Sequence, residues 1–346
     1  MRIMVFDVPA ESGGALSILN EYYENAVDYK DKSIEWIFVV SKPDLKPTDN
    51  VKILRYPWIK KSWFHRLYFD YFIAPKLVHK YDADKILSLQ NLIIPRVKGI
   101  KQSLYVHQSL PFVDYRFKFK DDKKLWIYQN IIGRKIISSI KKAENVIVQT
   151  KWMKKACIEK SGIKANKVEV RSPKIDIRVK ENFNHESNSM RTFFYPASGS
   201  YYKNHRIIVE ACEKLLDDRT LDFKVIFTLD SNENDHIANL YRKIKGKRLP
   251  IEFIGSISRE KVFEYYSKSI LLFPSYIETF GLPMLEARLH RTIILSSNRP
   301  FSKEVLGGYE NAYFFNPFDS EELRNLMEKV IKNEIKYNQV YNDVDI

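Results

Sequence analysis

Short apolar runs rich in branched side chains alternate with longer amphipathic segments through the first half of the chain. Helical patterns fall between most of these runs: one begins at about Ala15, after a turn over Pro9–Gly14, and two others cover Trp63–Tyr81 and Lys123–Lys142. Strands that alternate with helices require crossover connections, so this half predicts a parallel sheet. Its predicted strands are Arg2–Asp7, Ile34–Val40, Val51–Arg55, Lys85–Leu89, Ser103–Val106, Asn145–Gln149 and Val168–Arg171.

A polar stretch from Pro173 to about Met190 lacks apolar periodicity and indicates a domain junction. The alternation then restarts. The second set of predicted strands is Thr192–Tyr195, Phe223–Thr228, Ile251–Ile254, Ile270–Phe273, Ile293–Leu295 and Tyr313–Phe315, with helices over Asn204–Leu216, Glu233–Lys245, Arg259–Ser267, Pro283–Leu289 and Ser320–Lys332. The sequence therefore predicts an α/β protein of two tandem, doubly wound Rossmann-like domains, residues 1–175 and 176–346, whose last helix could pack back on the first domain. Ligands of such sheets bind beyond the carboxyl ends of the strands, so a groove between the domains is the expected site.

The amino-acid composition excludes several classes of protein. Hydrophobic residues make up 45% of the 346 residues and charged residues 29%, which is ordinary globular usage and excludes disordered and fibrous chains. No apolar run reaches the roughly 18 residues of a membrane-spanning helix, and the first ten residues do not resemble a signal peptide. Cys157 and Cys212 provide neither a disulfide framework nor metal-ligand spacing, so a reducing cytoplasm is expected.

The net charge of +14 is concentrated in one part of the chain. Residues 1–50 hold 5 basic and 9 acidic side chains, residues 51–180 hold 30 and 10, and residues 181–346 hold 22 and 24. The middle segment thus carries +20, which favours an anionic partner: nucleic acid, an acidic lipid surface or a phosphorylated substrate. A solvated basic face is the alternative.

The segment Leu272–Ala287 is the most informative for chemistry. It predicts a buried strand, a loop and then a helix, with Pro283 in the first helical turn, where its missing N–H costs nothing. Gly281 lets a ligand approach the backbone, and the free N–H groups at the start of the helix form an anion site. Glu278 and Glu286 flank this site, where carboxylates would be unfavourable unless they bound something else, such as sugar hydroxyls.

These residues resemble the Glu-x7-Glu signature of family 4 glycosyltransferases, retaining enzymes with the two-domain GT-B fold. The resemblance covers nearly the whole chain. The sequence of the segment Val106–Phe112 is also similar to that of bacterial capsule, O-antigen and lipopolysaccharide transferases. The other segments that carry the resemblance are Gly13–Gly14, Tyr105–Gln108, Tyr202–His205, Phe253–Ser256 and Phe273–Ser275.

The resemblance implies a role for each matching position. Glu286 would bind the nucleotide ribose, Glu278 with Thr279 would lie at the donor sugar, and Lys203 would pair with the diphosphate. The remaining positions are the amides of Phe280, Gly281 and Leu282 at the sugar and diphosphate, Ile254 and Gly255 near the base, Gly13 and Gly14 as a donor-binding loop, and His107 near the reacting carbon or the sugar 6-position. The catalytic set would be His107, Glu278 and Lys203. The structural alternatives are an exposed lysine, an interior histidine and a plain glycine turn.

Two features qualify this assignment. Many relatives carry an arginine some six residues before the lysine, but Ala197 stands there, so Arg206 or loop amides would have to supply the second phosphate contact. The triplet Asp82-Ala83-Asp84 looks like a metal-binding DxD motif, yet it follows a predicted helix and precedes a strand, which favours a structural role. We therefore expect neither metal nor other cofactor.

Aromatic and cationic residues interleave in Trp58–Phe69 and again in Tyr115–Lys120. Such stretches suit an anionic bilayer surface, and would also suit single-stranded nucleic acid or, for the first stretch, a buried aromatic cluster. The leading hypothesis is a cytoplasmic glycosyltransferase on the inner face of the cell membrane. It would act on a nucleotide sugar and a glycan or lipid-linked glycan acceptor, with no nucleic acid partner. A sugar-nucleotide epimerase or hydrolase and a basic nucleic-acid-binding protein are the alternatives.

Overall fold

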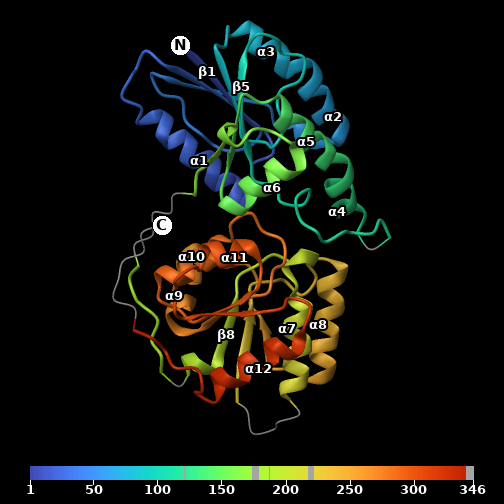
Figure 1. Cartoon of the computed structure of the whole chain (residues 1–346), viewed down its shortest axis with the longest axis vertical. Coiled ribbons are helices and arrows are strands. Elements are labelled where there is room, and N and C mark those ends of the chain that lie inside the picture. The colour runs from blue at the N-terminus through green and yellow to red at the C-terminus, as the bar shows by residue number, and fades with distance from the viewer. Residues whose placement is uncertain (121, 174–178, 187, 217–221, 340–346) are drawn as a thin grey trace. The chain divides into compact units, whose positions relative to one another are not determined.

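The chain forms two compact units, Met1–Ile175 and Asp176–Ile346, in a computed structural model (Figure 1). The structure describes residues 1–120, 122–173, 179–186, 188–216 and 222–339. Each unit is described by itself below, as unit 1 and unit 2. Both are parallel sheets covered by helices, which confirms the predicted tandem Rossmann-like architecture.

Unit 1 contains a seven-stranded parallel sheet in the order β3-β2-β1-β4-β5-β6-β7. Its first strand has neighbours on both sides, so Phe6 lies between Val39 of β2 and Ser88 of β4. The strands are β1 (Arg2–Asp7), β2 (Glu35–Val40), β3 (Val51–Arg55), β4 (Lys85–Ser88), β5 (Lys101–Val106), β6 (Asn145–Val148) and β7 (Val168–Val170).

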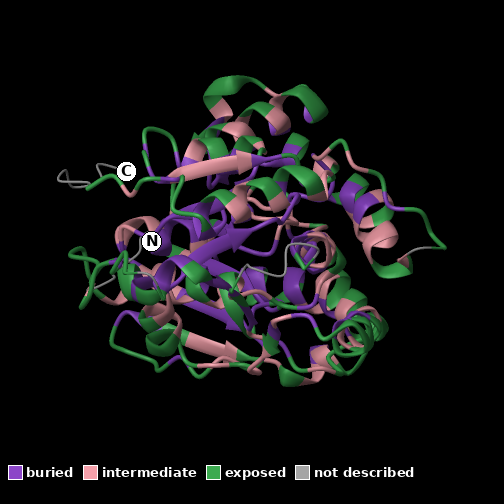
Figure 2. Cartoon of the chain, turned by 90° about the horizontal axis from the view of Figure 1, so that it is seen from below, coloured by how far each residue is buried: buried purple, intermediate pink, exposed green. Residues whose placement is uncertain are grey.

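Alternate residues of a strand face opposite sides of the sheet, and in unit 1 both sides are buried. Met4 and Phe6 of β1 pack with α3 (Ala74–Lys80), whereas Val5 packs with Ile18 of α1 (Gly13–Val27). This two-sided burial explains why the strands read as continuous apolar runs, and it places the sheets at the buried centre of the fold (Figure 2).

Two long helices of unit 1 each contain a π-helical turn. The first runs through α2 (Trp63–Tyr68), η2 (Phe69–Ile73) and α3, and the second through α4 (Lys123–Ile127), η3 (Tyr128–Ile132) and α5 (Gly133–Lys142). Pro75 has no N–H to offer to the carbonyl of Tyr71, and that carbonyl accepts instead from Arg96 Nη1 at 3.5 Å. The sequence predicted each of these helices as one continuous segment. It did not predict the π-helical turns, because these depend on contacts with neighbouring segments.

Unit 2 contains a six-stranded parallel sheet in the order β10-β9-β8-β11-β12-β13. The strands are β8 (Thr192–Tyr195), β9 (Lys224–Phe227), β10 (Ile251–Phe253), β11 (Ile270–Phe273), β12 (Ile294–Ser297) and β13 (Ala312–Phe315). The helices are η5 (Ser189–Arg191), η6 (Tyr201–Lys203), α7 (His205–Leu215), α8 (Asp235–Lys247), α9 (Arg259–Lys268), α10 (Leu282–Leu289), α11 (Pro300–Val305) and α12 (Ser320–Ile331).

Several predicted boundaries differ from the structure. Helix α1 begins at Gly13 rather than near Ala15, so the two glycines open the helix instead of preceding it. The sequence did not indicate α6 (Lys151–Ser161), whose buried face consists of three residues, nor the six-residue α11. The remaining short helices of unit 1 are η1 (Pro57–Lys61) and η4 (Ala165–Lys167).

The polar stretch expected to join the domains contributes to the packing of unit 2. Phe183 is buried, and its N–H donates to the His290 carbonyl at 2.7 Å. Residues 174–178 and 187 of this stretch lie outside the described part. Helix α12 packs on α7 of its own unit, with Lys214 Nζ 2.6 Å from Glu321 Oε1. In the described residues, no helix combines the length and apolarity needed to cross a bilayer.

Candidate functional site

The loop after β11 presents the start of α10. Gly281 precedes the first residue of α10 with a left-handed backbone (φ +91°), and a Cβ there would lie 2.5 Å from Met284 Cε. A side chain would therefore be strained twice, once by the backbone and once by the contact. The Gly281 carbonyl accepts from the Met284 N–H at 2.9 Å, and Pro283 lies in the first turn of α10 as predicted. The sequence Gly281-Leu282-Pro283 thus fixes where the helix begins.

Lys203 and Glu278 form a largely buried ion pair. Lys203 Nζ lies 2.5 Å from Glu278 Oε1, and the side chains are 18% and 15% exposed. Burial opposes the charged ammonium, but the adjacent carboxylate more than compensates and raises the pKa of Lys203 above its ordinary value. The structure therefore brings together, in unit 2, two of the three residues that the sequence assigned to catalysis.

Backbone contacts hold this ion pair in place. The carbonyl of Tyr202 accepts from the Tyr276 N–H at 3.2 Å, which ties η6 to the loop that carries Glu278. The hydroxyl of Tyr195, in β8, donates to the Lys203 carbonyl at 2.8 Å. Both segments follow strands at the carboxyl edge of the unit 2 sheet, where doubly wound sheets bind ligands.

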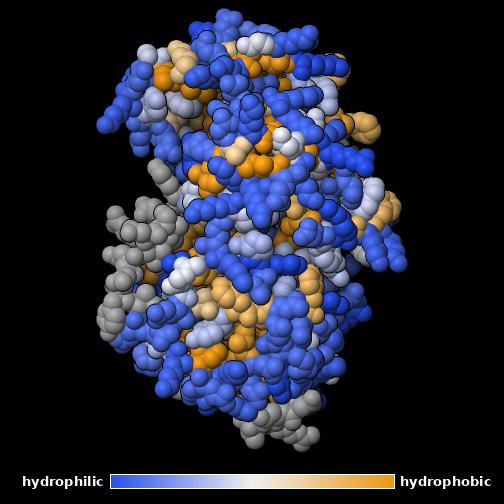
Figure 3. Space-filling model, in the orientation of Figure 1, coloured by the Kyte–Doolittle hydropathy of each residue, from blue (hydrophilic) through white to orange (hydrophobic). Residues whose placement is uncertain are grey.

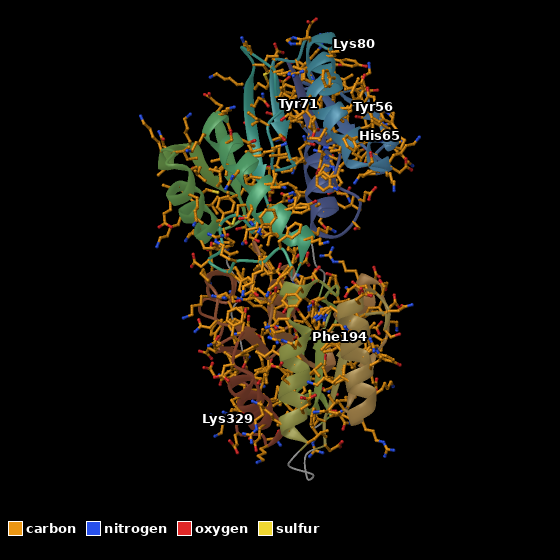
Figure 4. All side chains as sticks on the ribbon, turned by 90° about the vertical axis from the view of Figure 1, so that its right-hand side faces the viewer. Tyr56, His65, Tyr71, Lys80, Phe194 and Lys329 are labelled. Atoms are coloured by element: carbon orange, nitrogen blue, oxygen red, sulfur yellow. The ribbon has the colours of Figure 1, made fainter. Side chains whose placement is uncertain are left out.

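Glu286 is held by two residues that the sequence analysis did not single out. Its Oε1 accepts from Arg259 Nη2 at 3.1 Å, and its Oε2 accepts from the Tyr266 hydroxyl at 3.2 Å. Burial raises the pKa of Glu286, and both Arg259 and Tyr266 act against that rise. Phe194 of β8, labelled in Figure 4, stacks on Tyr265 with ring centroids 4.5 Å apart and packs edge-on against Tyr266 with centroids 6.0 Å apart. No motif marked Arg259, because an arginine that opens a helix is common.

The other residues assigned to this region occupy varied environments. The N–H groups of Ile254 and Gly255 donate to the carbonyls of Phe227 and Leu229 at 3.0 and 3.1 Å. Their amides are therefore used within the sheet edge, and a base could contact only their remaining atoms. Phe280 is buried, whereas Thr279 and Leu282 are half-buried at the start of α10.

The phosphate-binding side of the site lacks an obvious second cation. Ala197 opens a tight loop in which Gly199 donates to Glu233 Oε1 at 2.7 Å and accepts from Asn234 at 3.0 Å. Arg206 is exposed, and its Nε lies 3.6 Å from Glu210 Oε1 one turn along α7. This pairing gives no support to Arg206 as the second phosphate contact. That loop amides supply this contact remains a prediction.

His107, Gly13 and Gly14 belong to unit 1. His107 follows β5, and its N–H donates to Asn91 Oδ1 at 2.7 Å. Burial lowers the pKa of His107 to about 4, so the imidazole is neutral at physiological pH. Gly13 has φ +59°, and a Cβ on either glycine would meet no atom within 4 Å. The start of α1 is therefore open to a ligand.

Asp82 and Asp84 lie at the other end of the sheet. Asp84 Oδ2 accepts from the Arg2 N–H at 2.6 Å, and Asp82 Oδ2 lies 3.8 Å from Arg2 Nη1. Arg2 begins β1, so both aspartates contact the amino edge of the sheet; the absence of a metal role stays a prediction. Among the described residues, no group of three His, Cys, Asp or Glu side chains is arranged to hold a metal ion.

Exposed apolar side chains of unit 1 concentrate on two segments. Of thirteen large exposed apolar residues in the described chain, eight lie between residues 63 and 72 or between 119 and 131, including Phe64 at 83% and Trp63 at 57%. We call these eight the apolar ridge: Trp63, Phe64, Leu67, Tyr68, Tyr71, Phe72, Phe119 and Ile131. Figure 3 shows apolar groups projecting among polar ones at the edge of unit 1 beside α2 and α4.

Two residues of the Trp58–Phe69 stretch have structural roles. Trp58 is half-buried and packs edge-on against Phe69, a core residue. Lys60 donates to the Pro9 carbonyl at 2.9 Å and lies 3.4 Å from Glu11, so it fixes the loop after β1. The buried-cluster alternative therefore holds for part of this stretch, while Trp63, Phe64 and Tyr68 stay exposed.

Comparison with known proteins identifies unit 2. Residues 176–344 match the family model for glycosyl transferases group 1. The chain carries a group 1 glycosyltransferase domain. Serotype-specific mannosyltransferase WbdA of Escherichia coli is 30% identical over 115 residues, which are 33% of this chain and 14% of WbdA. The O-antigen chain mannosyltransferase RfbU of Salmonella typhimurium is 21% identical over 266 residues, 76% of this chain and 69% of RfbU.

Solved structures show the same fold over nearly the whole chain. Sucrose-phosphate synthase from Thermosynechococcus elongatus has a TM-score of 0.73 at 15% identity and covers 96% of this chain and 90% of its own. HepE from Anabaena, in complex with UDP and glucose, has a TM-score of 0.68 at 15% identity with the same coverage. The group 1 glycosyltransferase domain therefore forms the second half of a GT-B protein, as the resemblance implied.

Proposed function

We propose that the protein is a retaining glycosyltransferase of bacterial surface polysaccharide synthesis. It moves a sugar from a nucleotide-diphosphate sugar to a glycan or lipid-linked glycan. The observation that carries this proposal is the buried Lys203–Glu278 ion pair just before the start of α10, inside the group 1 glycosyltransferase domain. WbdA and RfbU are named as mannosyltransferases, which supports sugar transfer. RfbU is named for the O-antigen chain, which supports a role in surface polysaccharide synthesis.

Each site residue has a role in the donor complex. Glu286, oriented by Arg259 and Tyr266, accepts hydrogen bonds from the ribose hydroxyls, while Ile254 and Gly255 lie near the base. Glu278 and Thr279 hold the sugar hydroxyls. The N–H groups of Phe280, Gly281 and Leu282 contact the sugar and the diphosphate, because unpaired amides at a helix start attract anions. The donor-binding and catalytic roles of Gly13, Gly14 and His107, which belong to unit 1, stay predictions of the resemblance.

The chemistry is electrostatic. The bond between the anomeric carbon and the diphosphate oxygen breaks, and the acceptor oxygen attacks the same face of the sugar while its proton passes to the leaving phosphate. When the donor binds, Lys203 releases Glu278 and pairs with the diphosphate. The lysine and the helix amides then stay in place while negative charge develops on the leaving group. Glu278 is then free to accept from sugar hydroxyls. No protein nucleophile is needed for this front-face route.

The enzyme works in the cytoplasm at the inner face of the cell membrane. The apolar ridge and the basic middle segment, which carries +20 over residues 51–180, support this placement. Aromatic side chains lie at the headgroup level of a bilayer, and nearby cations interact with anionic lipids.

A panel of nucleotide sugars tests the proposal. One or more should raise the melting temperature, and product analysis should show a new glycosidic bond only when acceptor is added. Products formed without acceptor would indicate an epimerase or hydrolase. Proton NMR of the product should show the anomeric configuration of the donor, and an inverted configuration would contradict the retaining route.

Metal independence is a separate prediction. The phosphate contacts assigned above come from Lys203 and helix amides, so turnover should survive excess EDTA. Abolished turnover that manganese restores would overturn this part of the proposal and return attention to Asp82 and Asp84.

A further inference from the structure

Two adjacent pockets of unit 1 lie between the helical segments 63–80 and 123–142, and we treat them together as one groove. The first pocket has a volume of about 360 Å³ and the second about 600 Å³. Both are lined by Leu67, Asp70, Leu92 and Lys135, so these four residues mark the boundary between the two pockets.

The first pocket opens at the carboxyl ends of the strands. Pro9 follows β1, Gln90 follows β4 and Gln108 follows β5, and all three line it. Gln90 Oε1 and Asp70 Oδ1 are buried with no hydrogen-bond partner in the described part of the chain. Unsatisfied buried acceptors are unfavourable, and the hydroxyl groups of a bound ligand would satisfy these two.

The second pocket has an aliphatic floor. Leu92, Ile93, Val97 and Ile100 line it and are half-buried. The side chain of Gln102 fixes this loop, because it accepts from the Ile94 N–H at 2.8 Å and donates to the Ile94 carbonyl at 2.9 Å. The apolar floor is therefore a fixed surface rather than a loose loop.

Positive charge surrounds the groove. Seven cations and two carboxylates line the two pockets. Arg66 Nε lies 2.7 Å from Asp70 Oδ2, and Lys101 Nζ lies 3.3 Å from Glu144 Oε1, so both carboxylates are already paired. The cations are Lys60, Arg66, Arg96, Lys98, Lys101, Lys135 and Lys142.

The groove is continuous with the apolar ridge. Leu67 and Tyr71 belong to the ridge and also line the second pocket. Lys135 Nζ lies 5.9 Å from the centre of the Tyr71 ring, where the two pockets meet. In Figure 4, Tyr71 is labelled between His65 near the start of α2 and Lys80 at the end of α3. A molecule in the groove can therefore extend onto the surface that we assign to the membrane.

We propose that this groove binds a lipid phosphate, with its alkyl or prenyl chain on the floor of the second pocket and its phosphate at Lys135. A sugar attached to that phosphate then reaches Gln90 and Asp70 in the first pocket, toward the strand ends. If the proposed transfer holds, the acceptor is accordingly a lipid-linked saccharide rather than a free glycan. The half-buried aliphatic floor favours a hydrocarbon chain over a nucleic-acid strand, which requires stacking surfaces along its path.

The test uses the full chain and simple probes. Dodecyl phosphate, below its micelle concentration, should bind at least ten times more tightly by calorimetry than inorganic phosphate or the uncharged dodecyl maltoside. Lys135→Glu should weaken dodecyl phosphate binding at least tenfold. Lys141→Glu is the matched control, because Lys141 is exposed on α5 outside both pockets, and it should leave binding within twofold.

The outcomes separate the groove proposal from the proposed transfer. Equal binding of inorganic phosphate and dodecyl phosphate, equal effects of the two lysine variants, or displacement of the lipid by an oligothymidylate at equal concentration would each overturn the groove proposal. Binding of a nucleotide sugar is measured separately by melting temperature. If dodecyl phosphate binds and no nucleotide sugar does, the lipid site stands and the proposed transfer fails.

Discussion

The two glutamates of the group 1 domain have different partners at the level of single residues. Glu278 is compensated by Lys203, whereas Glu286 is compensated by Arg259 and Tyr266. Because the partners differ, the consequences of removing each carboxylate should differ as well.

Glu286→Ala should weaken nucleotide binding by roughly 1.5–3 kcal/mol, since the ribose hydroxyls lose a charged acceptor. Glu278→Ala should leave nucleoside diphosphate affinity no weaker, because it frees Lys203 for the phosphates, but should reduce turnover. Calorimetry and initial rates measure the two effects. Equal losses of diphosphate affinity in both variants would contradict this division.

Arg259 should control the pH range in which Glu286 binds ribose. The pKa of Glu286 is raised by burial and held down in part by Arg259, and ribose binding uses the ionised carboxylate. Nucleotide affinity should therefore fall as pH drops toward this raised pKa. In Arg259→Ala the fall should begin at a higher pH, and Arg259→Lys should restore most of the wild-type profile. Calorimetry between pH 5 and 8 tests this, and an unchanged profile in the alanine variant would remove the role.

At the scale of elements, short signals at helix starts position the site. Gly281 ends the β11 loop in a left-handed backbone, and η6 docks on that loop through Tyr202. The π-helical turns of unit 1 similarly belong to the helices that line the groove. In both units, residues with unusual backbone geometry thus lie at the sites to which we assign ligands.

Gly281→Ala should destabilise unit 2 by roughly 1–3 kcal/mol, because alanine is strained at φ +91° and its Cβ would contact Met284. Gly246→Ala in α8 is the matched control: a Cβ there meets nothing within 4 Å, and alanine favours the helix by about 0.4–1 kcal/mol. Thermal unfolding followed by circular dichroism should show opposite shifts. A stabilised Gly281→Ala would show that the loop conformation is not required.

At the scale of the whole molecule, the excess of basic residues and the apolar ridge lie in the same part of the chain. The middle segment carries +20, and the apolar ridge lies within it. Each basic residue near an anionic membrane contributes about 1 kcal/mol, so six to eight facing one surface would be sufficient for association.

The protein should bind anionic vesicles but not neutral ones, and salt should weaken the binding. Phe64→Ser with Tyr68→Ser should reduce it further, because both side chains are exposed on the ridge. Tyr29→Ser, also exposed in unit 1 but outside the ridge, is the control and should bind as wild type. Vesicle co-sedimentation measures all three. No binding at low salt would refute membrane association, and oligonucleotides tested alongside address the nucleic-acid alternative.

The sequence by itself determined the alternation of elements and the motif at Glu278–Glu286. Both depend on local order: buried parallel strands read as apolar runs, and a Gly-x-Pro helix start is written in adjacent residues. The Asp82–Asp84 triplet lies between α3 and β4, as its place in the sequence predicted, while its lack of a metal role stays a prediction.

Tertiary structure decided how distant residues pair. Arg259 is far from Glu286 in sequence and belongs to no motif. The groove of unit 1 is likewise lined by segments that are distant in the sequence, from Pro9 to Glu144. The structure also showed which residues of the aromatic stretch are exposed. Trp58 and Lys60 have structural roles, whereas Trp63 and Phe64 are exposed to solvent. A sequence pattern indicates which side chains are apolar or charged, but solvent exposure and long-range contacts depend on what packs against them.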